Sequence, residues 1–148
     1  MGLYKHILVP TDFSASSKRA LDTAVELALA FGAKLTITHA CEVPGYAYIG
    51  MMAPPIDYLT PLREAGDSLL QKTAASVRDK IPGVTALLRS GAPWQETLEV
   101  AREVGADLIV MGTHGRSGLA LAFMGSVAEK VVRMSPIPVL TLRAEEER

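Results

Sequence analysis

The residues best suited to bind a ligand are three glycines, a serine and a carboxylate that follow two apolar runs of the sequence. Gly112 and Gly115 let the chain turn tightly and bring backbone N–H groups close to a ligand, and Gly125 places free N–H groups at a helix start. Ser126 follows the last of these glycines at the start of a helical pattern, and a helix N-terminus favours an anion such as phosphate. Asp12 carries a carboxylate that can accept hydrogen bonds from ribose hydroxyls. Phosphate donors on one side and a sugar acceptor on the other describe a nucleotide site.

The charge distribution favours an anion beside the glycines. Residues 108–128 contain no Asp or Glu, whereas Arg116 is cationic and His114 is able to become so. The whole chain is close to neutral, with 15 Lys+Arg, 16 Asp+Glu and a formal net charge of −1. A domain that grips a nucleic-acid backbone is usually markedly basic, so we do not expect a nucleic-acid partner.

The same residues also have simpler interpretations. Glycines at this spacing occur in ordinary loops, and Asp12 is also a suitable cap for the helix that follows it. His114 is the obvious general-base candidate, but no nearby feature of the sequence pairs it with an orienting carboxylate. Ser126 is better suited to capping a helix and donating to phosphate than to nucleophilic attack. His39 and Cys41 share one strand, which favours packing over a metal site. We therefore predict neither a catalytic residue nor a metal ligand.

The common catalytic and nucleotide motifs are absent from the sequence. It contains no G-x-x-x-x-G-K-[ST] loop, no G-x-G-x-x-G after the first strand and no G-x-S-x-G nucleophile elbow. It also lacks the H-E-x-x-H and C-x-x-C spacings of metal sites. A P-loop NTPase, a dinucleotide-binding domain of the usual kind and an α/β-hydrolase are therefore not expected.

Length, cysteine content and hydropathy bound the class of protein. The 148 residues suit a single domain spanning residues 1–148, and 49% hydrophobic with 21% charged residues is typical of a globular chain. Cys41 is the only cysteine, so no intrachain disulfide is possible, which fits a reducing compartment. No apolar stretch reaches the length of a membrane span, and the N-terminus lacks a signal-peptide core. We expect a soluble cytoplasmic protein without a membrane partner.

Alternating strand and helix patterns must position these residues. Short β-branched runs predict strands at residues 6–10, 34–41, 84–88, 107–111 and 138–142. Apolar residues at steps of three and four predict helices that end at residue 31 and that span residues 62–77, 94–104 and 126–132. This order predicts an α/β fold, a doubly wound three-layer sandwich with a parallel sheet. Ligands bind such sheets beyond the carboxyl ends of the strands, where the winding direction reverses, so Asp12 and the glycine segment are expected to share one crevice.

The complete pattern resembles the universal stress protein family. Its nucleotide-binding signature is similar to Gly112-x-x-Gly115 followed, after nine residues, by Gly125-Ser126. The likeness extends to residues 7–14, His39, residues 91–93, 107–116 and 136–140, and covers roughly residues 5–143. It implies a five-stranded parallel sheet of order 3-2-1-4-5 with four helices. It also implies a homodimer that pairs through the last strand, Val139 to Leu142. An apolar, uncharged edge strand fits such pairing.

The resemblance also implies a ligand and its contacts. Members with this signature bind ATP, here with Mg²⁺, and Asp12 would hold the ribose or adenine side. The base would lie against Pro10, Thr11 and the backbone of Ala40. The ribose and phosphates would be surrounded by Met111, Gly112, His114, Gly115, Arg116, Gly125, Ser126 and Val127. Ala128 stands where some ATP binders carry a hydroxyl residue, so one phosphate contact would be missing.

The function implied is that of an ATP-binding regulatory module in the stress response. Two alternatives stay open from the residues. One is a slow ATPase or phosphotransferase, and the other is an interaction protein that ignores nucleotides or binds one of the AMP type. The long segment from Glu42 to Pro61, which contains Tyr46, Tyr48 and Tyr58, is predicted to be a loop. It serves either as a surface connection or as a lid or partner surface.

Overall fold

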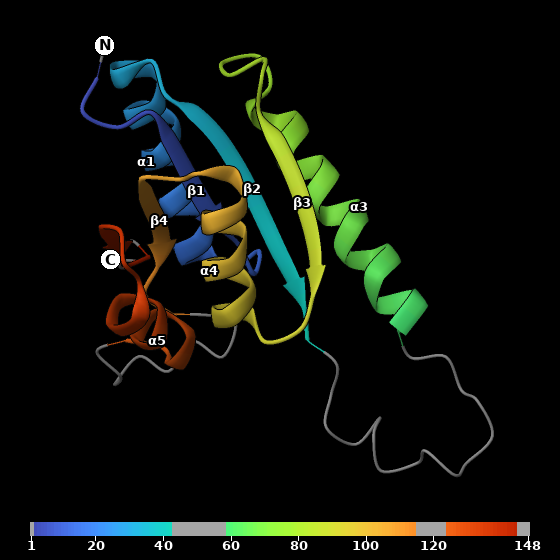
Figure 1. Cartoon of the computed structure of the whole chain (residues 1–148). Helices are drawn as coiled ribbons and strands as arrows, with labels where there is room; N and C mark the ends of the chain where they lie inside the picture. The colour runs from blue at the N-terminus through green and yellow to red at the C-terminus, as the bar shows by residue number, and fades with distance from the viewer. Residues whose placement is uncertain (1, 43–58, 115–123, 145–148) are drawn as a thin grey trace, which may run out of the picture.

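A computed structural model describes residues 2–42, 59–114 and 124–144, which form a sheet between two layers of helices (Figure 1). All strand pairs in the sheet are parallel, and the strand order is β3-β2-β1-β4-β5. The strands are β1 (His6–Pro10), β2 (Lys34–Cys41), β3 (Thr85–Ser90), β4 (Leu108–Gly112) and β5 (Val139–Leu142). The helices of the described residues are α1 (Ala15–Phe31), α3 (Leu59–Val77), α4 (Pro93–Val104) and α5 (Ser126–Met134). The predicted fold class, strand order and four helices are confirmed.

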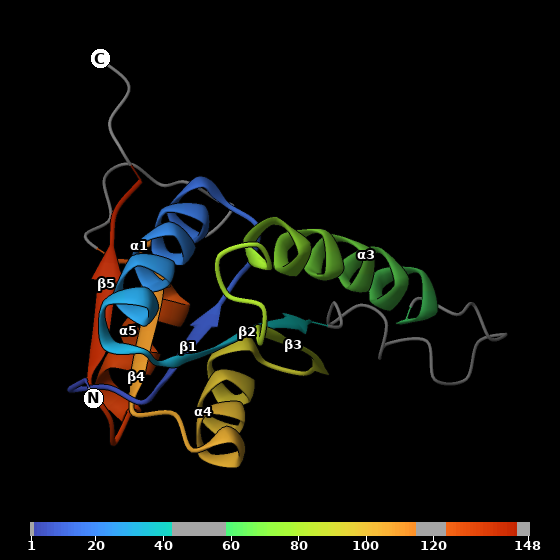
Figure 2. The same ribbon diagram turned by 90° about the horizontal axis from the view of Figure 1, so that it is seen from above.

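The helices cover both faces of the sheet, with α1 and α3 on one face and α4 and α5 on the other (Figure 2). Successive side chains of a strand point to opposite faces, so the apolar run of β1 feeds two cores. Ile7 and Val9 pack in the α1 and α3 layer, whereas Leu8 packs in the α4 and α5 layer. All three are fully buried. A strand buried on both sides is therefore a continuous apolar run rather than an alternating one.

Helix α1 is capped at both ends. Ser14 is the N-cap, and its Oγ accepts a hydrogen bond of 3.3 Å from the backbone N–H of Ser17. Gly32 ends the helix in the left-handed conformation with φ of 67°, and its N–H donates to the carbonyl of Ala28. Because the cap holds the first turn in place, the connection from β1 into α1 has a defined shape at the edge of the sheet.

Some predicted boundaries are wrong. Helix α3 begins at Leu59 and not at residue 62, so Pro61 lies in its first turn, where the missing N–H breaks no helical hydrogen bond. Strand β3 runs from Thr85 to Ser90 and so ends two residues later than predicted, because its last residues pair with the end of β2. The remainder of the predicted loop, residues 43–58, lies outside the described residues. None of the described helices combines the length and the apolar character needed to cross a bilayer.

Candidate functional site

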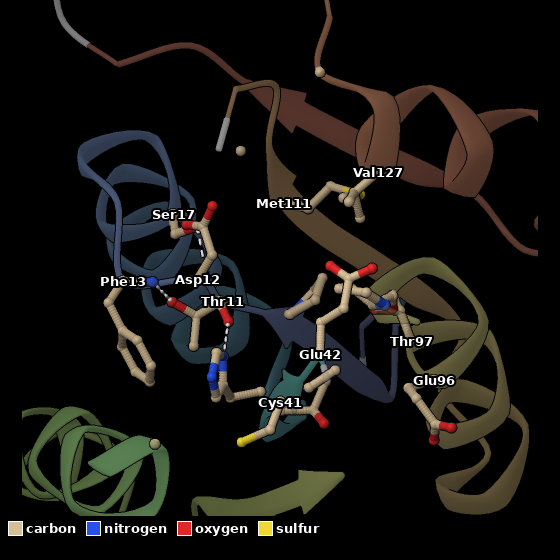
Figure 3. A pocket seen from close by; sticks show the side chains of 18 of the residues that line it. Thr11, Asp12, Phe13, Ser17, Cys41, Glu42, Glu96, Thr97, Met111 and Val127 are labelled. Carbon is tan, nitrogen blue, oxygen red and sulfur yellow. Dashed lines mark hydrogen bonds between the residues drawn. The ribbon is translucent and has the colours of Figure 1, made fainter. Parts of the chain in front are cut away.

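A cavity of about 520 Å³ opens at the carboxyl ends of the strands, where β1 and β4 are neighbours. The winding direction of the sheet reverses at this pair, because β2 and β3 extend to one side of it and β5 to the other. The cavity walls come from the ends of β1, β2 and β4, the first turns of α4 and α5, and one side of α3 (Figure 3). Its volume falls within the usual range of small-molecule sites.

Ten of the twelve residues predicted to bind a nucleotide line this one cavity. They are Pro10, Thr11, Asp12, Ala40, Met111, Gly112, His114, Gly125, Ser126 and Val127. The other two, Gly115 and Arg116, lie outside the described residues. The fold therefore brings together segments that are about a hundred residues apart in sequence, although contact of these residues with a nucleotide stays a prediction.

The carboxylate of Asp12 is held by the start of helix α1. Its Oδ1 accepts hydrogen bonds from the backbone N–H of Ser14 at 2.9 Å and from Oγ of Ser17 at 2.8 Å. Asp12 therefore does bond to the start of α1, as its interpretation as a helix cap requires, although the N-cap residue is Ser14. Asp12 also lines the cavity, so the same two hydrogen bonds orient a carboxylate at the edge of the candidate site.

The N-terminus of α5 lines the cavity at the place where the glycine pattern predicts an anion site. Its N-cap is Gly125, in an extended conformation and with no side-chain capping hydrogen bond. The first amides of a helix have no acceptor within the helix, and the helix dipole adds positive potential there. Ser126, Val127 and Ala128 form this first turn, and all three line the cavity. An anion in the cavity can therefore supply the acceptors that the cap residue lacks.

Gly112 has a packing role that differs from the tight turn we expected. An ideal Cβ added at Gly112 would lie 2.2 Å from Oγ and 2.7 Å from the carbonyl carbon of Ser16. Three described glycines, Gly32, Gly91 and Gly105, have a positive φ. Gly112 does not have a positive φ. Close approach to helix α1, rather than a left-handed backbone, therefore requires glycine here.

The same contact region ties the two walls of the cavity together. Oγ of Ser16 donates a short hydrogen bond to the backbone carbonyl of His114. The side chain of His114 interacts through Nδ1 with Oγ1 of Thr113, at 2.9 Å. The segment after β4 is therefore anchored on the first turn of α1, which places His114 at the cavity beside the glycine segment.

His39 and Phe13 also line the cavity, although the family resemblance gives neither of them a ligand contact. Nδ1 of His39 lies 2.8 Å from the carbonyl oxygen of Thr11, and its ring centroid lies 4.6 Å from that of Phe13. Phe13 has a φ of 66°, which is uncommon for a residue with a bulky side chain. Its backbone N–H donates to Oγ1 of Thr11 at 3.0 Å, which holds that conformation. His39 thus packs against Phe13, as expected for a structural residue, and it also lines the cavity.

Other lining residues were missed by sequence reasoning. They come from the end of β2 and from helices α3 and α4, and include Cys41, Glu42, Leu62, Gly66, Leu69, Glu96 and Thr97. Only the Gly-Ala-Pro start of α4 gave a signal for any of them. Burial raises the pKa of the Cys41 thiol, against the weaker effect of nearby Arg63, so this cysteine is poorly suited to nucleophilic chemistry. The described residues contain no group of three or more His, Cys, Asp or Glu side chains that could hold a metal ion.

The fold and the cavity together define a doubly wound α/β domain with a ligand crevice at the switch point of its sheet. The chain belongs to the universal stress protein family, whose model matches residues 3–143. It is 34% identical over 143 residues to universal stress protein MJ0531 of Methanocaldococcus jannaschii, an alignment that covers 95% of this chain and 83% of the relative.

Solved structures of the same family share the fold. Universal stress protein UspA from Lactobacillus plantarum superposes with a TM-score of 0.80 at 23% identity, covering 95% of this chain and 98% of that one. A universal stress protein solved in complex with cAMP has a TM-score of 0.67 at 30% identity, covering 96% of this chain and 99% of that one.

Proposed function

We propose that this protein binds ATP, with Mg²⁺, in the cavity at the β1–β4 switch point and acts as a nucleotide-dependent regulatory module of the stress response in the cytoplasm. The observation that carries the proposal is the N-terminus of α5, where the N-cap Gly125 has no side chain to cap the helix and which lines the same cavity as Asp12 and the ends of β1 and β2. Phosphates accept hydrogen bonds from the first amides of α5, and the nucleoside extends along the strand ends.

The charges of the cavity support a polyphosphate at the α5 end. The described cavity residues that come from β4, from the segment after it and from α5 include no Asp or Glu. The carboxylates of the described lining, Asp12, Glu42 and Glu96, come from the other segments. Mg²⁺ enters with the phosphates, because this ion commonly keeps several waters and binds through substrate phosphate oxygens. A relative that is 30% identical was solved with cAMP, which is itself an adenine nucleotide.

A substitution at the α5 N-cap separates nucleotide binding from folding. Gly125 has φ of −69° and ψ of 161°, which any residue adopts, and Asp and Asn are both favourable N-caps. Gly125→Asp places a negative charge where the phosphates would lie, whereas Gly125→Asn adds a cap of nearly the same shape without the charge. We expect both variants to stay folded and the Asp variant to bind ATP more weakly than the Asn variant by at least about ten-fold, as expected for a repulsion of 1.4 kcal/mol.

Two measurements test the proposal. Mass spectrometry of the freshly purified, denatured protein identifies any nucleotide that it carries, and calorimetry of the stripped protein with ATP and Mg²⁺ gives the affinity. No bound nucleotide, together with no heat and no thermal stabilisation at millimolar ATP, contradicts the proposal. If the protein releases phosphate from ATP faster than buffer alone, and His114→Ala abolishes this release, ATP is a substrate and not a regulatory ligand.

We also propose that the protein is a homodimer paired through β5. This strand lies at the edge of the described sheet, with β4 as its partner on the other side. Apolar side chains on it and on α5 are exposed, with 37% of Leu140, 45% of Val132 and 56% of Met134 accessible. An apolar edge strand is a template for pairing with a second chain. Sedimentation equilibrium should give twice the 15.8 kDa mass of the chain, and a monomer at micromolar concentration contradicts this proposal.

A further inference from the structure

Three carboxylates belong to the described cavity lining, and local structure accounts for two of them. Asp12 accepts hydrogen bonds from the first turn of α1, as described above. Glu96 lies in the first turn of α4, where a negative charge is favourable to the helix dipole. Its Oε1 lies only 2.7 Å from the position that a Cβ on Gly91 would take, so its carboxylate rests against that backbone. Both side chains therefore have a role in the fold.

Glu42 has no comparable role in the described structure. It directly follows β2, and the described contacts give its carboxylate neither an ion pair nor a hydrogen bond. Figure 3 shows its side chain extending from the end of β2 into the cavity, on the side of Thr97 and toward Met111 and Val127. Glu42 is also exposed to solvent, so its carboxylate is free to reorient toward a ligand that fills the cavity.

The position of Glu42 along the crevice indicates which part of a nucleotide it meets. The phosphates lie at the N-terminus of α5, beyond β4, in the function proposed above. Strand β2 is two places from β4 in the sheet, and neighbouring strands are about 4.8 Å apart, so the end of β2 is roughly 10 Å away. That separation suits the nucleoside, and the base then lies beside Ala40, Glu42 and Thr97.

We propose that the carboxylate of Glu42 accepts a hydrogen bond from the exocyclic amino group of the base and thereby selects 6-aminopurine over 6-oxopurine nucleotides. This inference rests on the proposed function. An ionised carboxylate accepts hydrogen bonds and donates none. A 6-oxopurine presents an acceptor at this position, and its own donor, N1–H, lies at the neighbouring ring atom. A carboxylate placed to accept from the 6-amino group therefore meets a second acceptor, and sites that hydrogen-bond a donor of the substrate reject analogues that lack it there.

The test compares the affinities of ATP and inosine triphosphate (ITP), which carries an oxo group in place of the 6-amino group. Calorimetry with Mg²⁺ should show that the wild-type protein binds ATP at least about ten-fold more tightly than ITP, the low end for a hydrogen bond to a charged group. In Glu42→Gln the side-chain amide can also donate to the oxo group, so the ratio should fall to near one. The negative charge of Glu42 repels both triphosphates equally, so a purely electrostatic role would change both affinities and leave the ratio unchanged.

Glu99→Gln is the matched control, because Glu99 lies on α4 outside the cavity lining and pairs with exposed Arg102. It should keep the wild-type ratio, and thermal melting should show that both variants are folded. A wild-type ratio near one, or an unchanged ratio in Glu42→Gln, overturns the selective role of Glu42 while nucleotide binding stands. If the wild-type protein binds neither triphosphate, the proposed function fails and this inference fails with it.

Discussion

Replacement of Gly112 by alanine should destabilise the protein in the absence of any ligand. The added Cβ would lie 2.2 Å from Oγ, 2.7 Å from the carbonyl carbon and 2.9 Å from Cβ of Ser16. The side-chain oxygen can rotate away, but the backbone carbon can move only if the first turn of α1 moves with it. That turn carries the bond from Ser16 to the His114 carbonyl, so relief of the clash also weakens the link between the cavity walls. Overpacking of this kind costs about 1–3 kcal/mol.

Urea titration of the stripped protein, followed by circular dichroism, measures this loss. Thermal melting is a second measurement of the same loss, because in a chain of this length each kcal/mol lowers the melting temperature by roughly 2–4 °C. Gly83→Ala is the matched control, because no atom lies within 4 Å of its added Cβ and its backbone is not left-handed. It should change the free energy of unfolding by less than about 0.5 kcal/mol. If Gly112→Ala is as stable as Gly83→Ala, the packing argument is wrong and glycine at this position serves the ligand alone.

Three other substitutions probe the framework of the site, each by unfolding measurements. Burial acts to raise the pKa of Asp107, but backbone N–H groups of His6 and Lys5 donate to it and hold the pKa below the ordinary 3.8. Because the folded-state pKa is the lower one, the carboxylate stabilises the fold above that ordinary value and loses this effect as the pH falls through the folded pKa. Asp107→Asn should therefore lower the urea midpoint at pH 7 and reduce its fall toward pH 3; an equal fall in both proteins contradicts this. Leu70→Ala should cost about 2–5 kcal/mol, because Leu70 is fully buried in the core. Ser14→Ala should cost about 1 kcal/mol through loss of the α1 cap, and an unchanged melting temperature would argue against the cap.

Local patterns predicted most of the sheet because its central strands are buried on both faces. The bounds of β1 and β2 agree with the sequence prediction, since each is a short apolar or β-branched run between clear turn residues. The predicted start of α3 is wrong because Pro61 closes a proline-rich stretch typical of a loop, whereas proline is also well tolerated in the first turn of a helix. The end of β3 was wrong because polar Arg89 and Ser90 extend the strand only through their pairing with Ala40 and Cys41. That pairing depends on tertiary contacts and leaves no local signal.

The residues of the candidate site also divide into those that the sequence predicts and those that it does not. Residues at the ends of β1 and β4 were predictable, because the order of elements places the carboxyl ends of parallel strands at one edge of the sheet. The walls from α3 and α4 were not, because they depend on how these helices cross the sheet. Gly66 shows the difficulty: its added Cβ would lie 3.0 Å from Sγ of Cys41 and 3.1 Å from Cδ2 of His39, a close contact between a helix and a strand. In the sequence it is one glycine within a helical pattern.

The serines before and within the first turn of α1 show why a site cannot be derived from residue types alone. Hydroxyl groups beside a predicted phosphate crevice suggest ligand donors, but Ser16 and Ser17 are 2% and 6% exposed and make contacts within the protein. Oγ of Ser17 donates to Asp12, and Oγ of Ser16 donates to the carbonyl of His114. The bond from Ser17 holds the loop after β1 on the first turn of α1, and the bond from Ser16 connects that turn to the segment after β4. The two segments are the two sides of the reversal in the sheet. The cavity is therefore braced before a ligand arrives, and such preorganisation reduces the ordering cost of binding. In the proposed function, phosphate recognition therefore falls to the backbone amides of α5, where the cap residue Gly125 has no side chain to compete with a ligand.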